Sequence, residues 1–196
     1  MRNAEATKEK ILSTAAGLFN VQGFKATSLK DITDATSFTK GAIYRHFHDK
    51  ETLEESTYDF ISSKMQGKLR EVIKEKDTAP EKLLAICDFF TANIHSPIII
   101  GGCPILNAGV ESDDTKPGLN LKVRQLLDVF QYSLKHIIRR GIEYKQIKPD
   151  VLPNYFASIF IASLEGGVLL SKIRKSSKDM EWVLEDLKMR VSDISI

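Results

Sequence analysis

The sequence predicts an all-α protein of about nine helices. Of its 196 residues, 42% are hydrophobic and 28% are charged, which is the usual composition of a folded globular protein. Its six prolines and eleven glycines are too few for the frequent turns of a β-sandwich or β-barrel. Apolar residues recur every three or four positions along most of the chain, and this spacing places them on one face of a helix.

Three short helices are predicted within the first fifty residues. Gly23 ends the first, because glycine readily adopts the left-handed conformation that closes a helix. Thr27 or Ser28 can cap the second helix and Thr39 the third, since hydroxyl oxygens accept hydrogen bonds from the free N–H groups at a helix start. The predicted spans are about 7–21, 29–35 and 40–47.

Six further helices are predicted in the rest of the chain. Asp49 can cap the fourth, which is long enough to join two units, and Pro80 suits the first turn of the fifth. The apolar run 98–102 has no partner strand, so we expect a buried connector there. The eighth helix is apolar almost all round, which predicts burial on more than one side. The predicted spans are about 50–77, 80–96, 104–111, 119–142, 151–174 and 178–194.

The cysteines and the apolar runs predict a cytoplasmic protein. Cys87 and Cys103 cannot build a disulfide framework, and the first ten residues lack the apolar core of a signal peptide. The longest apolar runs fall short of the roughly 20 residues that span a membrane, so we expect no membrane-spanning segment.

Positive charge is concentrated at the start of the chain. The formal net charge is +2, but residues 1–50 hold eight Lys or Arg against five Asp or Glu, whereas the remainder holds 20 against 21. This distribution suggests that the first quarter contacts a polyanion. We therefore expect two domains, a nucleic-acid-binding domain over 1–50 and a second domain over 51–196.

The second and third helices form a predicted helix-turn-helix. Two short helices joined by a short turn and supported by a preceding helix present one exposed helix to the major groove of DNA. The third helix offers cationic and hydroxyl donors, with small residues between them that let the backbone approach base edges. Its exposed positions are predicted to be Lys40, Gly41, Ala42, Tyr44, Arg45 and His46.

The segment ATSLKDITDATSFTKGAIYRHFHDKET, residues 26–52, resembles the DNA-binding domain of the TetR family of bacterial regulators, and the resemblance extends from about residue 7 to 53. The resemblance implies that phosphates are held by Thr27, Ser28, Thr39, Tyr44, His46 and Lys50. It implies that bases are faced by Lys40, Gly41, Ala42 and Arg45, with Lys30 near the groove edge. In the turn, the family often has Gly and a smaller aliphatic residue where this chain has Ser37 and Phe38. We expect a strained left-handed Ser37 and a tilted third helix.

Each of these residues has an alternative interpretation. Tyr44 can belong to the core, and Arg45, Lys30 and Lys50 can be solvated surface charges. His46 and a second histidine two residues later lack a Cys or acidic residue at a usual ligand spacing, so no metal site is predicted.

Beyond residue 53 the resemblance is architectural and implies a homodimer joined through the last two helices. Small residues interrupt the eighth helix, and a glycine inside a helix costs about 1 kcal/mol relative to alanine, which close contact with a partner helix would offset. Packing inside one subunit is the alternative. The predicted dimer residues are Ala157, Ala162, Ser163, Gly166, Gly167, Val183, Leu184, Leu187 and Val191.

The resemblance also implies a ligand pocket among the middle helices, where aromatic walls with a few polar groups suit a small amphipathic molecule. The predicted lining is Phe60, Met65, Phe89, Phe90, His95, Cys103, Asn107, Phe130 and Tyr132, with packing in the core as the alternative for each. The segment 101–112 resembles the sixth helix of a subgroup that includes multidrug-type regulators. A redox role for Cys103 is a further alternative.

The sequence thus predicts a repressor that binds a palindromic DNA operator as a homodimer and is released by a small molecule. Coupling would run through the fourth helix, which joins both units. No catalytic motif is present, so neither an enzyme nor a cofactor is expected. A ligand-independent regulator or activator is one alternative, and an all-helical small-molecule-binding or enzymatic module without DNA binding is another.

Overall fold

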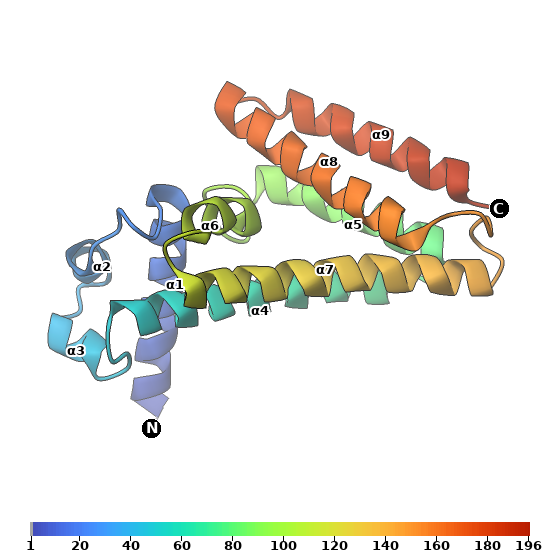
Figure 1. Ribbon diagram of the computed structural model, residues 1–196. Helices are drawn as coiled ribbons and strands as arrows, with labels where there is room; N and C mark the ends of the chain where they lie inside the picture. The colour runs from blue at the N-terminus through green and yellow to red at the C-terminus, as the bar shows by residue number, and fades with distance from the viewer. Residues whose placement is uncertain (1) are drawn as a thin grey trace. The chain divides into compact units, whose positions relative to one another are not determined.

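The computed structural model describes residues 2–196. Over this range the chain forms nine α-helices and no strand (Figure 1), which confirms the all-α prediction. The helices are α1 (Arg2–Gln22), α2 (Leu29–Thr36), α3 (Lys40–Tyr44), α4 (Lys50–Lys74), α5 (Ala79–His95), α6 (Pro104–Ser112), α7 (Pro117–Glu143), α8 (Pro153–Arg174) and α9 (Lys178–Ile194). The largest difference from the predicted spans is at the start of α1, which begins five residues earlier, and α3 and α4 each stop three residues earlier.

The chain divides into two compact units. The first comprises the residues up to Lys64 together with Ile99–Leu126, and the second comprises Met65–Ile98 and Leu127–Ile196. As predicted for the fourth helix, α4 contributes residues to both units, and α7 does the same. The division into 1–50 and 51–196 separates expected functions and stays a prediction. By packing, α6 and the starts of α4 and α7 belong with α1, α2 and α3.

The core of the first unit holds α1, α2 and α3 together. The apolar stripe of α1 lies inward, and its Phe19 stacks on Phe24 with ring centroids 4.7 Å apart. The inward residues from the other elements, all buried, are Ile32, Ile43, Phe47, Leu53, Tyr58, Leu119 and Val123. Because α2 and α3 each give this core only a few side chains, most of their remaining surface faces outward.

Side chains at helix starts fix the ends of α2 and α3. Ser28 caps α2, and its hydroxyl and the carboxylate of Asp31 form a reciprocal capping box. At α3, the Thr39 hydroxyl accepts a hydrogen bond from the N–H of Ala42 at 3.2 Å. Between the helices Ser37 has φ 60° and ψ 19°, which confirms the predicted left-handed conformation.

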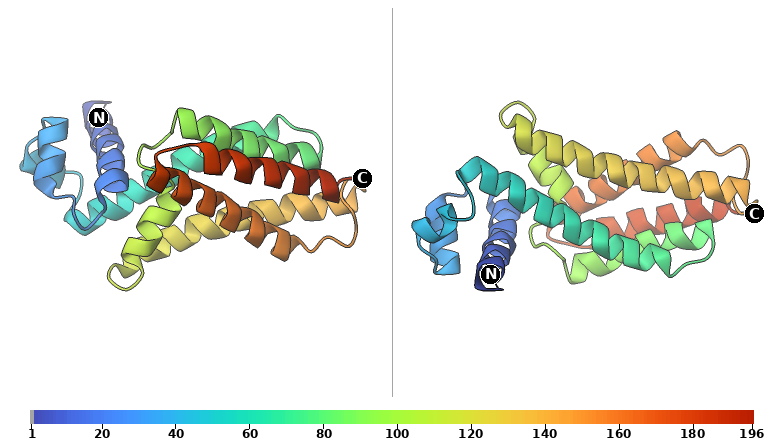
Figure 2. Two further views of the ribbon diagram at one scale, coloured as in Figure 1. Left: turned by 90° about the horizontal axis from the view of Figure 1, so that it is seen from above. Right: turned by 90° about the horizontal axis from the view of Figure 1, so that it is seen from below.

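The second unit is a packed group of helices around α8 and α9, which lie side by side and run in opposite directions (Figure 2). A Cβ atom at Gly167 would lie 2.6 Å from Sδ of Met180, so glycine permits the close approach of the two helices. A second capping box, between Thr78 and Glu81, begins α5. Burial raises the pKa of Cys87 in α5 to about 12, so its thiol is unreactive at neutral pH.

One expectation about burial needs correction. The connector before α6 is predicted to be buried, but Ile100 is 57% exposed. The two glycines that follow it, Gly101 and Gly102, have positive φ angles.

The burial of α8 on more than one side stays a prediction, because the second side is the expected contact with a partner subunit. Within the subunit, 28% of the most apolar window of α8 is buried, and Phe160 and Leu164 are core residues. This helix is long and apolar enough to cross a membrane by length and composition, but a core helix passes the same test.

Candidate nucleic-acid interface

The short helix α3 has one buried side and one exposed side. Ile43 and the following Phe47 anchor it in the core, with exposed fractions of 1% and 2%. Tyr44 is 49% exposed, so the alternative that placed it in the core is wrong. The other predicted contact residues of this segment are exposed or half-buried, namely Thr39, Lys40, Gly41, Ala42, Arg45 and His46.

Gly41 has no packing reason to be glycine. A Cβ atom there would meet only the hydroxyl of Thr39, at 3.9 Å. Glycine in a helix is unfavourable by about 1 kcal/mol relative to alanine. Packing in the core therefore does not require glycine at this position. On the outer surface, the absent side chain leaves the backbone accessible to another molecule.

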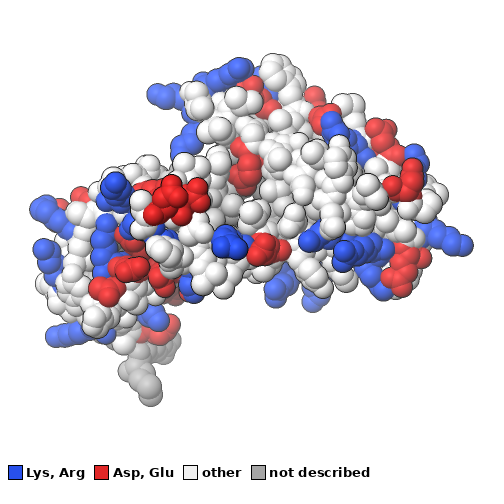
Figure 3. Space-filling model, viewed as in Figure 1, with Lys and Arg blue, Asp and Glu red and all other residues white. Residues whose placement is uncertain are grey.

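Cationic side chains surround this exposed side. Figure 3 shows Lys and Arg along the edge of the first unit that carries α2 and α3. Lys40 and Arg45 are exposed on α3, and Lys25 is exposed before α2. Sequence reasoning did not single out Lys25, although its place just before the predicted second helix was a usable signal. Such a surface suits a polyanion that presents both phosphates and hydrogen-bonding edges.

Thr27 is a correction to the predicted phosphate contacts. It is fully buried, its hydroxyl donates to the carbonyl of Gly23 at 2.7 Å, and its N–H donates to the same carbonyl at 3.1 Å. Both donors point inward because they close the turn after α1. Ser28 takes the exposed capping position instead, and its N–H group holds the pKa of Asp31 below its ordinary value.

Two predicted phosphate-binding lysines have partners within the chain. Lys30 is exposed and donates to Asp34 at 2.6 Å, an exposed pair one helical turn apart that raises the pKa of Lys30 and that a phosphate would have to displace. Lys50 is half-buried: its ammonium donates to the carbonyl of Phe24 at 3.0 Å and lies 3.3 Å from the buried carboxylate of Glu54. Lys50 therefore supports the turn before α2 as well as offering a charge at the surface.

The residues predicted to line a pocket are divided between the two units. Phe60, Cys103 and Asn107 belong to the first unit, and the other six to the second, namely Met65, Phe89, Phe90, His95, Phe130 and Tyr132. Phe90 and Phe130 are buried and stack at 6.1 Å. Tyr132 is 62% exposed and His95 is also exposed, so the prediction that these two line an enclosed site is wrong. The described residues contain no cluster of three His, Cys, Asp or Glu that could hold a metal ion.

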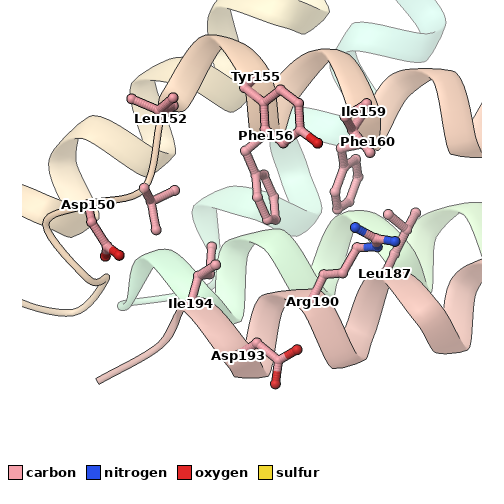
Figure 4. A pocket seen from close by; sticks show the side chains of 11 residues that line it. Asp150, Leu152, Tyr155, Phe156, Ile159, Phe160, Leu187, Arg190, Asp193 and Ile194 are labelled. Carbon is pink, nitrogen blue, oxygen red and sulfur yellow. The ribbon is translucent and has the colours of Figure 1, made fainter.

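A pocket of about 380 Å³ lies between the start of α8 and the end of α9 (Figure 4). Apolar side chains form most of its wall, and Arg190 reaches across its α9 side, where its guanidinium donates to Asp186 at 2.6 Å. The lining residues are Asp150, Val151, Leu152, Tyr155, Phe156, Ile159, Phe160, Leu187, Arg190, Asp193 and Ile194. Sequence reasoning did not predict this pocket, because helical spacing alone does not show where two helices diverge.

The predicted dimer residues fall into two groups. Packing within the subunit already buries five of them, which corrects their assignment: Ala157, Gly167, Leu184, Leu187 and Val191. Ala162 is exposed, Ser163 and Val183 are half-buried, and a Cβ atom at Gly166 would meet nothing within 4 Å. Sequence reasoning missed the large apolar side chains on the same outer face, which are Leu152, Tyr155, Leu169, Leu170, Ile173, Trp182 and Met189.

Two family models match the chain. The model described as "Bacterial regulatory proteins, tetR family" matches residues 11–56. The model described as "Tetracyclin repressor-like, C-terminal domain" matches residues 79–187, which is more than half of the chain. The first match covers the whole helix-turn-helix, and the second extends from α5 into α9.

Relatives match along nearly the whole length. The HTH-type transcriptional repressor DhaR of Mycobacterium sp. (strain GP1) is 23% identical over 177 residues, covering 90% of this chain and 88% of the relative. The crystal structure of a TetR transcriptional regulator from Chloroflexus aurantiacus J-10-FL is 33% identical, has a TM-score of 0.95, and covers 100% of this chain and 98% of its own. A TetR-family regulator from Cytophaga hutchinsonii gives 31% identity, a TM-score of 0.92 and the same coverage.

Proposed function

We propose, since the chain belongs to the TetR family of helix-turn-helix transcriptional regulators, that it represses transcription as a homodimer bound to a palindromic operator and that a small molecule releases it. The observation that carries the DNA-binding part is the exposed side of α3, with Lys40 and Arg45 beside a glycine that the interior does not require. Such a protein acts where the chromosome is, so the proposed location is the cytoplasm.

The proposed contacts follow from exposure and chemistry. Lys40 and Arg45 would donate to base edges, and Gly41 and Ala42 would let the α3 backbone come close to them. Phosphates would be held by hydroxyl, imidazole and ammonium donors, some of them at helix starts, where free N–H groups also favour anions. These donors are Ser28, Lys30, Thr39, Tyr44, His46 and Lys50.

The apolar outer face of α8 and α9 supports the homodimer. Side chains such as Tyr155, Ile173 and Trp182 are each more than half exposed, and large apolar patches on a subunit mark sites of association. In a two-fold interface whose axis is perpendicular to α8, the start of α8 in one subunit meets its end in the other. The pocket at the start of α8 would then receive an apolar side chain from the opposite end of the partner.

DNA binding can be tested without knowing the operator. The full chain is used to select binding sites from random DNA duplexes, and the affinity for the selected site is then measured at two salt concentrations. We expect inverted repeats whose half-sites are about one helical turn apart or more, and an affinity that falls steeply with salt. Selected sites without two-fold symmetry would contradict binding as a homodimer. Selection that enriches no DNA sequence would contradict sequence-specific DNA binding.

Substitutions on α3 test which side chains contact bases and which contact phosphates. Lys40→Ala is expected to weaken binding to the selected site and to relax its sequence preference, because a base contact is lost. Tyr44→Ala is expected to weaken binding to every sequence equally, because a phosphate contact is lost. Arg139→Ala, at an exposed position of α7 in the second unit, serves as the control and should leave DNA binding unchanged.

Release by an effector is tested on the protein–DNA complex. A library of small amphipathic molecules is screened for compounds that dissociate the complex and raise the melting temperature of the free protein. A compound that does both supports an effector site. A complex that no member of a broad library dissociates would favour the ligand-independent regulator.

A further inference from the structure

The α6 region carries a hydrogen-bond arrangement that the proposed DNA contacts do not use. The segment 101–112 contains three glycines, a proline at the first turn of α6, and Asn107 and Glu111 one helical turn apart. Residues four apart lie on the same side of a helix. In the first unit, this side of α6 faces the end of α1 and the turn that leads to α2.

Asn107 binds the last turn of α1. Its amide nitrogen, with two N–H hydrogens, lies within hydrogen-bond distance of three acceptors: the carbonyl of Asn20 at 3.1 Å, the side-chain oxygen of Asn20 at 3.0 Å and the carbonyl of Gly101 at 2.9 Å. Asn20 is only 3% exposed, and its own amide donates to the carbonyls of Ile100 and Gly102. Two amide side chains therefore join α1, α6 and the connector, and a buried asparagine at an inward position of α1 is explained.

Glu111 binds the turn itself. Its two carboxylate oxygens accept the backbone N–H groups of consecutive residues, Phe24 at 2.8 Å and Lys25. Hydrogen bonds from N–H groups to a carboxylate are stronger than those between neutral groups. The carbonyl of Phe24 accepts the ammonium of Lys50, so the peptide groups on both sides of Phe24 are held.

Two glycines make room for these bonds. A Cβ atom at Gly101 would lie 2.6 Å from the Asn20 carbonyl oxygen, and one at Gly23 would lie 3.0 Å from a Glu111 oxygen. Both glycines also have positive φ angles, 106° and 95°, which other residues rarely adopt. The close approach of α6 to α1 therefore depends both on the bonding side chains of α1 and α6 and on glycines in the segments that they contact.

We propose that Asn107 and Glu111 are positioning residues that clamp the α1–α2 turn, so that the attachment of α6 sets the placement of α2 and α3 and hence the affinity for DNA. The Ser28 cap of α2 lies only three residues beyond Lys25, so a turn released from Glu111 leaves the start of α2 less constrained. The predicted effect on DNA affinity rests on the proposed function. The predicted role of Asn107 and Glu111 in holding the α1–α2 turn does not depend on it.

The clamp is tested by hydrogen exchange on the full chain without DNA. In Glu111→Ala the amides of Phe24 and Lys25 lose their acceptor, and their protection is expected to fall by about tenfold or more. Glu111→Gln keeps one acceptor oxygen and should fall in between. Asp113→Asn removes an exposed carboxylate at the end of α6 and should leave both amides unchanged. Unchanged protection in Glu111→Ala would overturn the clamp, and Glu111→Gln decides the matter if the alanine variant fails to fold.

The effect on DNA is measured with the selected operator. Glu111→Ala and Asn107→Ala are expected to bind about tenfold more weakly, with the same dependence on salt as the unmodified protein, because no phosphate contact is removed. Amides that lose protection while DNA affinity stays unchanged would overturn the positioning role. Failure of the unmodified protein to bind any duplex would instead overturn the proposed function and leave the hydrogen-exchange result standing.

Discussion

Gly41 and Gly167 both lie inside helices, but their surroundings are opposite. At Gly167 a Cβ atom would lie 2.6 Å from Sδ of Met180, so the glycine allows α8 and α9 to pack closely. At Gly41 a Cβ atom would meet nothing closer than 3.9 Å. The helix-destabilising cost of Gly167 is offset by contacts within the chain, whereas nothing inside the chain offsets the cost of Gly41. The comparison separates a structural residue of the second unit from a surface residue of the first.

The largest effect is expected at the outer face of the second unit. Trp182→Glu removes an exposed tryptophan that we assign to the dimer interface, and truncation of a central interface tryptophan costs about 2 kcal/mol or more in association. Sedimentation velocity at micromolar concentration should show monomers with an unchanged helical circular-dichroism spectrum. Glu185→Gln, an exposed position on the same helix, is the control. A variant that remains dimeric would place the interface elsewhere.

Gly167→Val tests the packing side of the comparison. The added atoms collide with Met180 and Val183, and overpacking of this kind typically costs about 1–3 kcal/mol. Urea denaturation should therefore give a lower free energy of unfolding. Gly166→Ala, where a Cβ atom meets nothing within 4 Å, should instead not destabilise the subunit. An equal loss of unfolding free energy in Gly167→Val and Gly166→Ala would contradict a packing role specific to Gly167.

Gly41→Ala tests the surface side. Alanine is the better helix former, so the free energy of unfolding is expected to rise by up to about 1 kcal/mol. Affinity for the selected operator should fall nevertheless, because the methyl group separates the α3 backbone from the bases. The two measurements thus move in opposite directions. Unchanged DNA affinity would mean that Gly41 does not lie against DNA.

The smallest effect concerns the charged start of α4. The N–H of Thr52 donates to Asp49, and this bond with the neighbouring His48 lowers the pKa of Asp49 from 3.8 to about 2. A lowered pKa in the folded state stabilises the fold above the ordinary value, and this contribution is lost as the pH falls toward 2. Asp49→Asn should be slightly less stable than the unmodified protein at pH 6, and the difference should shrink between pH 4 and pH 2. A pH-independent difference would exclude a charge effect.

The sequence predicted some features of the fold well because their causes are local. The caps of α2 and α3 and the left-handed Ser37 all depend on residues within one turn of each other. Lys40 and Arg45 could be placed on the exposed side of α3 because Ile43 and Phe47 fix its buried side. Thr27 was misplaced because a hydroxyl at a helix start can point either way, and only the carbonyl of Gly23 decided its direction.

Helical spacing and capping act over a few residues, so the sequence pattern alone predicts the nine helices, the helix-turn-helix and the residue types that face outward from it. Other features depend on how the helices pack: which small residues of α8 are buried within the subunit, where α8 and α9 separate to form a pocket, and the contact of Glu111 with the turn after α1. These features join residues far apart in the chain, and such pairings depend on how the helices pack rather than on any short pattern.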